Sequence, residues 1–124
     1  MKRTILVALC LVAVASQAQA PAIKRTLLQR ADLGDGREAI VGIAEISAGG
    51  ATGRHTHFGT EIGYVMEGIT TLEVQGEPTK TLKAGDSYTI PAGRVHNATA
   101  TGGATKVIAT YVVDKDKPLA TVVP

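Results

Sequence analysis

The segment His55-Thr56-His57-Phe58-Gly59-Thr60-Glu61, followed later by Pro91-Ala92-Gly93-Arg94-Val95-His96, contains all three histidines of this 124-residue chain. Residues i and i+2 of a strand point to the same face, so His55 and His57 can present two imidazoles toward one point. Two imidazoles aimed together are typical of a metal site. Glu61 and His96 are a carboxylate and a third imidazole in the same two segments.

Around these segments, short apolar stretches alternate with glycine-rich turns, and no stretch carries an uninterrupted helical stripe with caps. Within residues 69–74, Leu72 and Val74 share one face and Thr71 and Glu73 the other, as in a half-buried antiparallel strand. Many short strands at this spacing predict an all-β sandwich or barrel. We expect strands at residues 23–28, 39–46, 54–58, 61–67, 69–75, 79–82, 87–90, 95–100 and 106–113. The first dozen residues of the mature protein and the tail from 114 to 124 are expected to be loose or to pack against a partner.

The first twenty residues have the layout of a secretory signal peptide. Lys2 and Arg3 precede an apolar run over residues 5–15, which is too short to span a bilayer comfortably, and small residues follow it. We therefore expect a signal peptide over residues 1–20, cut between 15 and 20, and one domain over 21–124. The mature protein is expected to be secreted or periplasmic and to have no membrane span, with an uncleaved membrane anchor as the alternative.

Composition excludes several classes of partner and of chemistry. Removal of Lys2 and Arg3 lowers the number of basic residues from 13 to 11, which equals the 11 acidic residues, so no basic surface for nucleic acid is expected. The chain has no Trp, three Tyr and one Phe, too few aromatics for a base-stacking platform. Its only cysteine, Cys10, lies in the expected signal peptide, so the mature protein has no disulfide.

The histidine segments resemble the two sequence motifs of the cupin superfamily, as found in small single-domain bacterial cupins. The first motif, G-x5-H-x-H-x3,4-E-x6-G, is matched at every typed position. The second, G-x5-P-x-G-x2-H-x3-N, is matched except at its end, where Ala100 replaces an Asn that is not a metal ligand in the family. The matching residues are Gly49, His55, His57, Glu61, Gly68, Gly85, Pro91, Gly93 and His96.

This resemblance implies a double-stranded β-helix, or jelly-roll barrel, in which His55, His57, Glu61 and His96 bind a divalent metal ion. Three nitrogens and one oxygen suit several transition metals and leave two positions of an octahedral ion open. Mn, Fe or Ni is preferred from the family, and Zn is the alternative, because ligand type does not settle the metal. In some relatives the carboxylate detaches to act as a base, which makes Glu61 a candidate catalytic residue.

Two arginines flank the histidines in sequence. Arg94 lies in a turn, where the alternation of side chains along a strand does not predict which way a residue points. It is a candidate residue for binding a substrate carboxylate. Arg54 is expected to face away from the site, because it directly precedes a ligand on the same strand. Tyr88 and Tyr111 are interpreted as side chains that fill the barrel.

The leading functional hypothesis is a metal-dependent enzyme that acts on a small oxygen-bearing organic molecule. Dioxygenase-type chemistry and enolate-stabilising isomerase or lyase chemistry both remain open, because fold and ligands do not separate them. The alternative is a binding or sensing module in which the metal anchors a small molecule without turnover. The resemblance also implies a homodimer, formed by exchange or packing of terminal strands, for which residues 23–28 are available.

Overall fold

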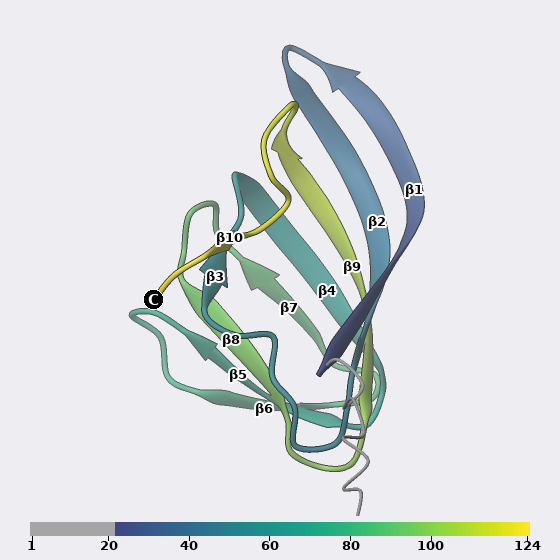
Figure 1. Cartoon of the computed structure of the whole chain (residues 1–124), viewed down its shortest axis with the longest axis vertical. Helices are drawn as coiled ribbons and strands as arrows, with labels where there is room; N and C mark the ends of the chain where they lie inside the picture. Colours follow the sequence, from purple (N-terminus) through teal and green to yellow (C-terminus); the bar gives the residue numbers. More distant parts are fainter. Residues whose placement is uncertain (1–21) are drawn as a thin grey trace, which may run out of the picture.

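Two five-stranded antiparallel sheets face each other, and strands from distant parts of the sequence lie side by side in each sheet (Figure 1). The structure is a computed structural model that describes residues 22–124. One sheet has the order β1-β2-β9-β4-β7 and the other β10-β3-β8-β5-β6, which confirms the predicted all-β jelly-roll barrel. The strands are β1 (Ile23–Gly34), β2 (Arg37–Ile46), β3 (His55–Thr56), β4 (Gly59–Glu67), β5 (Ile69–Val74), β6 (Lys80–Lys83), β7 (Ser87–Ile90), β8 (His96–Ala100), β9 (Thr105–Asp114) and β10 (Thr121–Val122).

The core lies between the sheets, and strict alternation along the strands builds it. In β9 every second residue from Thr105 to Val113 is buried, and the residues between them are half-buried. Leu72 and Val74 of β5 are buried while Glu73 points out, as the sequence pattern predicted. Apolar side chains from both sheets pack into one cluster that consists of Val65, Leu72, Val74, Leu82, Ile90 and Val107.

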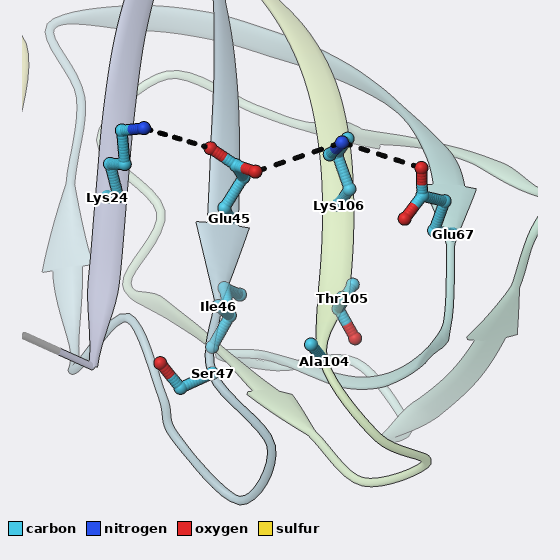
Figure 2. Close-up of a pocket in the computed structure, with 8 residues that line it drawn as sticks. All are labelled: Lys24, Glu45, Ile46, Ser47, Glu67, Ala104, Thr105 and Lys106. Carbon is cyan, nitrogen blue, oxygen red and sulfur yellow. Dashed lines mark ion pairs between the residues drawn. The ribbon is translucent and has the colours of Figure 1, made fainter. Parts of the chain in front are cut away.

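On the outer face, a row of charged side chains crosses four strands in register (Figure 2). Lys24, Glu45, Lys106 and Glu67 are successive cross-strand neighbours on β1, β2, β9 and β4. Their ion pairs measure 3.8, 3.8 and 3.4 Å from one end of the row to the other. Exposed pairs of this kind contribute little stability each, but opposite charges directly across a ladder favour the observed register.

Strand β1 is longer than predicted, because the expected strand ended at residue 28 and the observed one continues to Gly34. The pairing with β2 shifts register between Leu27 and Gln29, so the bulge resets the alternation that a sequence pattern depends on. A tight turn then reverses the chain into β2, with positive φ at Gly34, Asp35 and Gly36.

The C-terminal tail is not loose, which corrects the expectation for residues 114–124. Thr121 and Val122 of β10 pair with Thr56 and His55 of β3. The amide of Lys115 also donates to the carbonyl of Gly36 at 2.8 Å. These contacts use the backbone and not an apolar side-chain pattern, so no pattern in the sequence indicated them.

The expected signal peptide lies outside the described residues. No helix long and apolar enough to cross a membrane is found in residues 22–124.

Candidate metal centre

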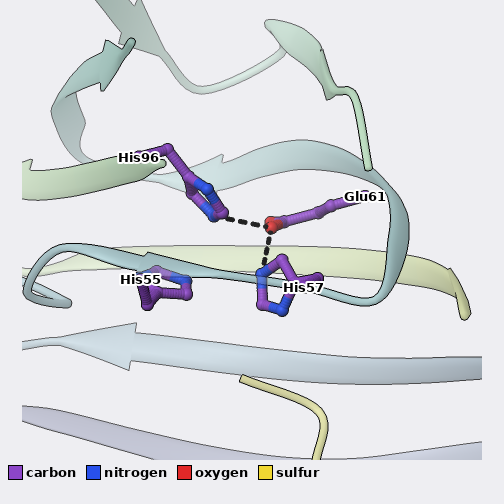
Figure 3. A group of neighbouring side chains, drawn as sticks. All are labelled: His55, His57, Glu61 and His96. Carbon is purple, nitrogen blue, oxygen red and sulfur yellow. Dashed lines mark ion pairs between the residues drawn. The ribbon is translucent and has the colours of Figure 1, made fainter. Parts of the chain in front are cut away.

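Three imidazoles and one carboxylate meet between the two sheets (Figure 3). His55 of β3 lies directly opposite His96 of β8, His57 follows β3, and Glu61 reaches them from β4 of the other sheet. Their ligand atoms all lie within 4.8 Å of one another. All four residues are buried, with exposed fractions of 6%, 5%, 5% and 4% in chain order. The structure therefore brings together every ligand predicted from the sequence.

Backbone carbonyls fix the orientation of all three imidazoles. Each ring donates its Nδ1–H to a carbonyl oxygen, which leaves the Nε2 lone pair as the free coordinating atom. Outer hydrogen bonds of this kind hold the tautomer that metal binding requires. The acceptors are Gly53 for His55 at 2.8 Å, Leu119 for His57 at 2.5 Å and Arg94 for His96 at 2.9 Å.

Two of the inward nitrogens lack a hydrogen-bond partner among the residues that the structure describes. Nε2 of His57 and Nε2 of His96 lie 2.9 and 3.3 Å from Oε2 of Glu61, yet neither makes a hydrogen bond within the described part of the chain. Because the Nδ1 atoms carry the ring protons, these contacts place nitrogen lone pairs against a carboxylate oxygen. A cation at the centre turns this costly arrangement into four favourable contacts, so the residues fit a divalent metal ion.

The protonation states also suit a metal. Burial, together with the charges of His96 and His57, lowers the pKa of His55 to about 4. Burial alone would raise the pKa of Glu61, but the close contacts with His57 and His96 and the hydrogen bond from Tyr88 outweigh it and hold this pKa at about 2. The carboxylate is therefore ionised and His55 neutral at pH 7, as metal ligands must be.

Tyr88 makes a contact with the centre that the sequence did not indicate. Its hydroxyl donates to Oε1 of Glu61 at 2.7 Å, which leaves Oε2 facing the imidazoles. Burial, together with the charge of Glu61, raises the pKa of Tyr88 well above its ordinary value, so the hydroxyl remains a donor. The ring passes over Gly63, its cross-strand partner on β4, where any side chain would overlap it. The interpretation as a barrel-filling residue was therefore incomplete.

The two flanking arginines point to other partners. Arg54 is exposed, as predicted, and its guanidinium donates to the carbonyl of Pro124 at 3.2 Å. The guanidinium of Arg94 donates to the carbonyl of Gln75 at 2.8 Å, and Arg94 is not among the residues that line the cavity at the centre. A substrate-binding role for Arg94 stays a prediction, and it requires the release of this hydrogen bond.

Two adjoining hollows connect the centre to the inner face of β1. The central cavity, about 30 Å³, is lined by His55, Glu61 and His96 and continues to Arg25. The second, of about 200 Å³, runs beneath β1 and over Tyr111. A hollow of about 400 Å³ on the outside of the sheet has charged side chains that pair with one another (Figure 2), so it offers no comparable site.

Comparisons with known proteins agree with this fold and site. Residues 42–113 match the cupin domain family, which is more than half of the chain, so the chain belongs to the cupin family. No curated protein matches it in sequence.

Three solved structures illustrate the similarity. KdgF from Halomonas sp. is 25% identical, with a TM-score of 0.65 over 81% of this chain and 86% of that one. An oxalate oxidase in complex with the substrate analogue glycolate is 21% identical, with a TM-score of 0.68 over 86% and 58%. The DMSP lyase DddQ from Ruegeria pomeroyi DSS-3 is 19% identical, with a TM-score of 0.63 over 68% and 42%. The last two resemblances concern the fold.

Proposed function

We propose that this cupin is a metal-dependent enzyme acting on a small organic molecule that binds the ion through oxygen donors. The observation that carries the proposal is the buried group of four ligand atoms, in which two Nε2 atoms have no hydrogen-bond partner among residues 22–124. A divalent ion held there supplies a Lewis acid with open positions for oxygen ligands. Mn, Fe or Ni is our preferred working metal, with Zn as the alternative.

The surrounding residues hold the site ready for this chemistry. The three carbonyl acceptors prevent the imidazoles from rotating, and Tyr88 restrains one oxygen of Glu61. Glu61 is also the candidate base, because its carboxylate is ionised and lines the central cavity. The small cavity around the ligands leaves little room for bulk water.

Two reaction classes remain within this proposal. The similar structures include an oxidase and a lyase, and they support chemistry with and without oxygen on the same fold. The protein is therefore to be loaded separately with Mn, Fe, Ni or Zn and incubated with β-diketones, enolisable acids and polyphenols. Oxygen uptake and product mass are the measurements.

Each outcome favours one class of function. Oxygen consumption that disappears in His57→Ala supports a dioxygenase, whereas a product formed without oxygen supports an isomerase or lyase. Ligand binding without any product, across all four metals, would overturn the enzyme proposal in favour of a binding or sensing module. The variant His57→Ala controls for free metal in solution.

We also propose that the protein is exported, with a signal peptide removed between residues 15 and 20. The charge and apolar pattern of the first twenty residues supports this. Intact mass of protein recovered from the periplasm or medium tests it. A mass that retains residue 1 would contradict it.

A homodimer through β1 is our proposal for the assembly. Leu27 and Leu28 are 61% and 42% exposed, and β1 pairs with β2 along one edge only within residues 22–124. Light scattering on Leu27→Lys and on the wild type tests it. A monomeric wild-type protein at micromolar concentration would overturn the proposal.

A further inference from the structure

Arg25 points from β1 toward the inside of the barrel. It lies opposite Ala44 in the β1–β2 ladder, and Ala44 lies opposite the buried Val107 of β9. Directly paired residues of an antiparallel sheet project to the same face, so Arg25 shares the face that carries the metal ligand Glu61. Arg25 accordingly lines the same cavity as His55 and Glu61.

Within the described part of the chain, the guanidinium of Arg25 has no counter-ion. The other inward charges of β1 are paired, because Arg30 lies 3.4 Å from Glu38 and Asp32 forms an ion pair with Lys115. Arg25 has no acidic partner within 4 Å among residues 22–124. An arginine that faces a functional cavity without a partner is available to an anionic ligand.

The hollow beneath β1 provides the space that the centre lacks. We call it the β1 groove and define it by Arg25, Leu27, Ala44, Tyr111 and Leu119. The central cavity of about 30 Å³ holds little more than one water molecule. The β1 groove offers about 200 Å³, and the two hollows share Arg25, Ala44 and Tyr111.

We propose that the β1 groove binds the substrate and that Arg25 holds its carboxylate, so that the substrates of this protein are short organic acids. This inference rests on the proposed function, because the metal would hold the oxygen donor at the other end of the molecule. Arg25 is then a specificity-determining residue that separates acids from neutral molecules of the same shape.

The charges and size of the site favour this class of substrate. Burial and the charge of Glu61 raise the pKa of Tyr111 while the charge of Arg25 lowers it, so both groups act on the same ring. Tyr111 thus lines the cavity that also contains Glu61 and Arg25. A groove of about 200 Å³ is smaller than the roughly 300–1,000 Å³ typical of pockets for drug-sized ligands, which indicates a short aliphatic acid.

A pair of matched ligands tests the inference. The nickel-loaded protein is titrated by calorimetry with 2,4-dioxopentanoate, which has a carboxylate beside its two oxygen donors, and with acetylacetone, which lacks it. The ratio of the two dissociation constants is the measured quantity. In Arg25→Gln we expect 2,4-dioxopentanoate to bind at least about tenfold more weakly and acetylacetone to be unaffected, since a hydrogen bond to a charged group is lost. Arg25→Lys should keep part of the preference.

Lys24→Gln is the matched control, because Lys24 is the neighbouring cation on β1 but faces outward and pairs with Glu45. It should leave the ratio at the wild-type value, and metal content and melting temperature verify that each variant is folded. An unchanged ratio in both Arg25 variants, or an equal loss in Lys24→Gln, would overturn the proposed role of Arg25. Metal-dependent binding of the ligands would in that case still support the proposed function. If neither ligand binds the nickel-loaded wild type, the proposed function fails, and this inference fails with it.

Discussion

The hydroxyl of Tyr88 donates to Oε1 of Glu61 at 2.7 Å, while Oε2 of the same carboxylate faces the imidazoles of His57 and His96. The carboxylate therefore has one oxygen for orientation and one for the metal. A ligand restrained in this way loses less freedom when it binds an ion, so Tyr88 is a positioning residue for the site.

Tyr88→Phe should weaken metal binding by about 10- to 100-fold, because the ring is kept and only the donor to Glu61 is lost. Competition titration against a chelating dye measures the affinity. Tyr64→Phe is the matched control, since Tyr64 is 48% exposed on the outer face of β4. Equal affinities of the two variants would contradict the role of Tyr88.

Gly63→Ala should displace the ring of Tyr88 and weaken metal binding to a similar extent. The added methyl group would overlap the ring carbons and the hydroxyl, so the side chain has to move off Glu61. A double-mutant cycle with Tyr88→Ala isolates the effect, because without the ring the alanine has room. The prediction fails if Gly63→Ala changes the affinity by the same factor in both backgrounds.

The four ligands of the site were predictable from sequence because their spacing is local or follows a known motif. His55 and His57 share a strand face, and His96 follows a turn with Pro91 and Gly93. Tyr88, Leu119 and Arg25 were not identified, because each reaches the centre through strand register and tertiary position. No residue spacing in the sequence indicates that Gly63 lies opposite Tyr88 or that a C-terminal carbonyl lies beside His57.

For the fold, the alternation of apolar and polar residues identified most strands. The strand that was predicted too short and the strand that was missed both have physical causes. The bulge after Leu27 shifted the inward and outward positions of β1, so its second half did not read as a strand. Strand β10 consists of two exposed residues held by backbone hydrogen bonds, which leave no side-chain pattern.

Removal of residues 116–124 should weaken metal binding by about 10- to 100-fold, because His57 loses the carbonyl acceptor of Leu119 and His55 loses its backbone pairing with β10. Leu119→Ala is the control that separates this contact from packing. It keeps the carbonyl and shortens a side chain that packs on Ile40, Ala109, Tyr111 and Val113, so it should lower stability and leave the affinity nearly unchanged. Metal titration and urea unfolding of both proteins measure the two effects. A truncated protein with wild-type affinity would refute the role of the tail.

Metal removal should lower the melting temperature of the wild type by roughly 10 °C or more. Binding to the folded state alone adds about 2.7 kcal/mol to the free energy of unfolding when free metal is a hundredfold above its dissociation constant. Thermal unfolding with and without chelator measures the shift. His57→Ala should melt at nearly the same temperature in both conditions, and an equal shift in this variant would show that the stabilising ion lies elsewhere.

Acidification should destabilise the metal-free protein most steeply between pH 6.5 and 4. Burial lowers the pKa of His55 from 6.5 to about 4, so within this window the unfolded chain binds a proton that the folded protein does not. The free energy of unfolding therefore falls as the pH falls from 6.5, and this contribution is fully present above 6.5. His55→Gln removes the titrating group and should flatten the dependence in the same window. Urea unfolding of both metal-free proteins at pH 7, 6 and 5 measures the slopes, and parallel curves would show that another buried group is responsible for the acid sensitivity.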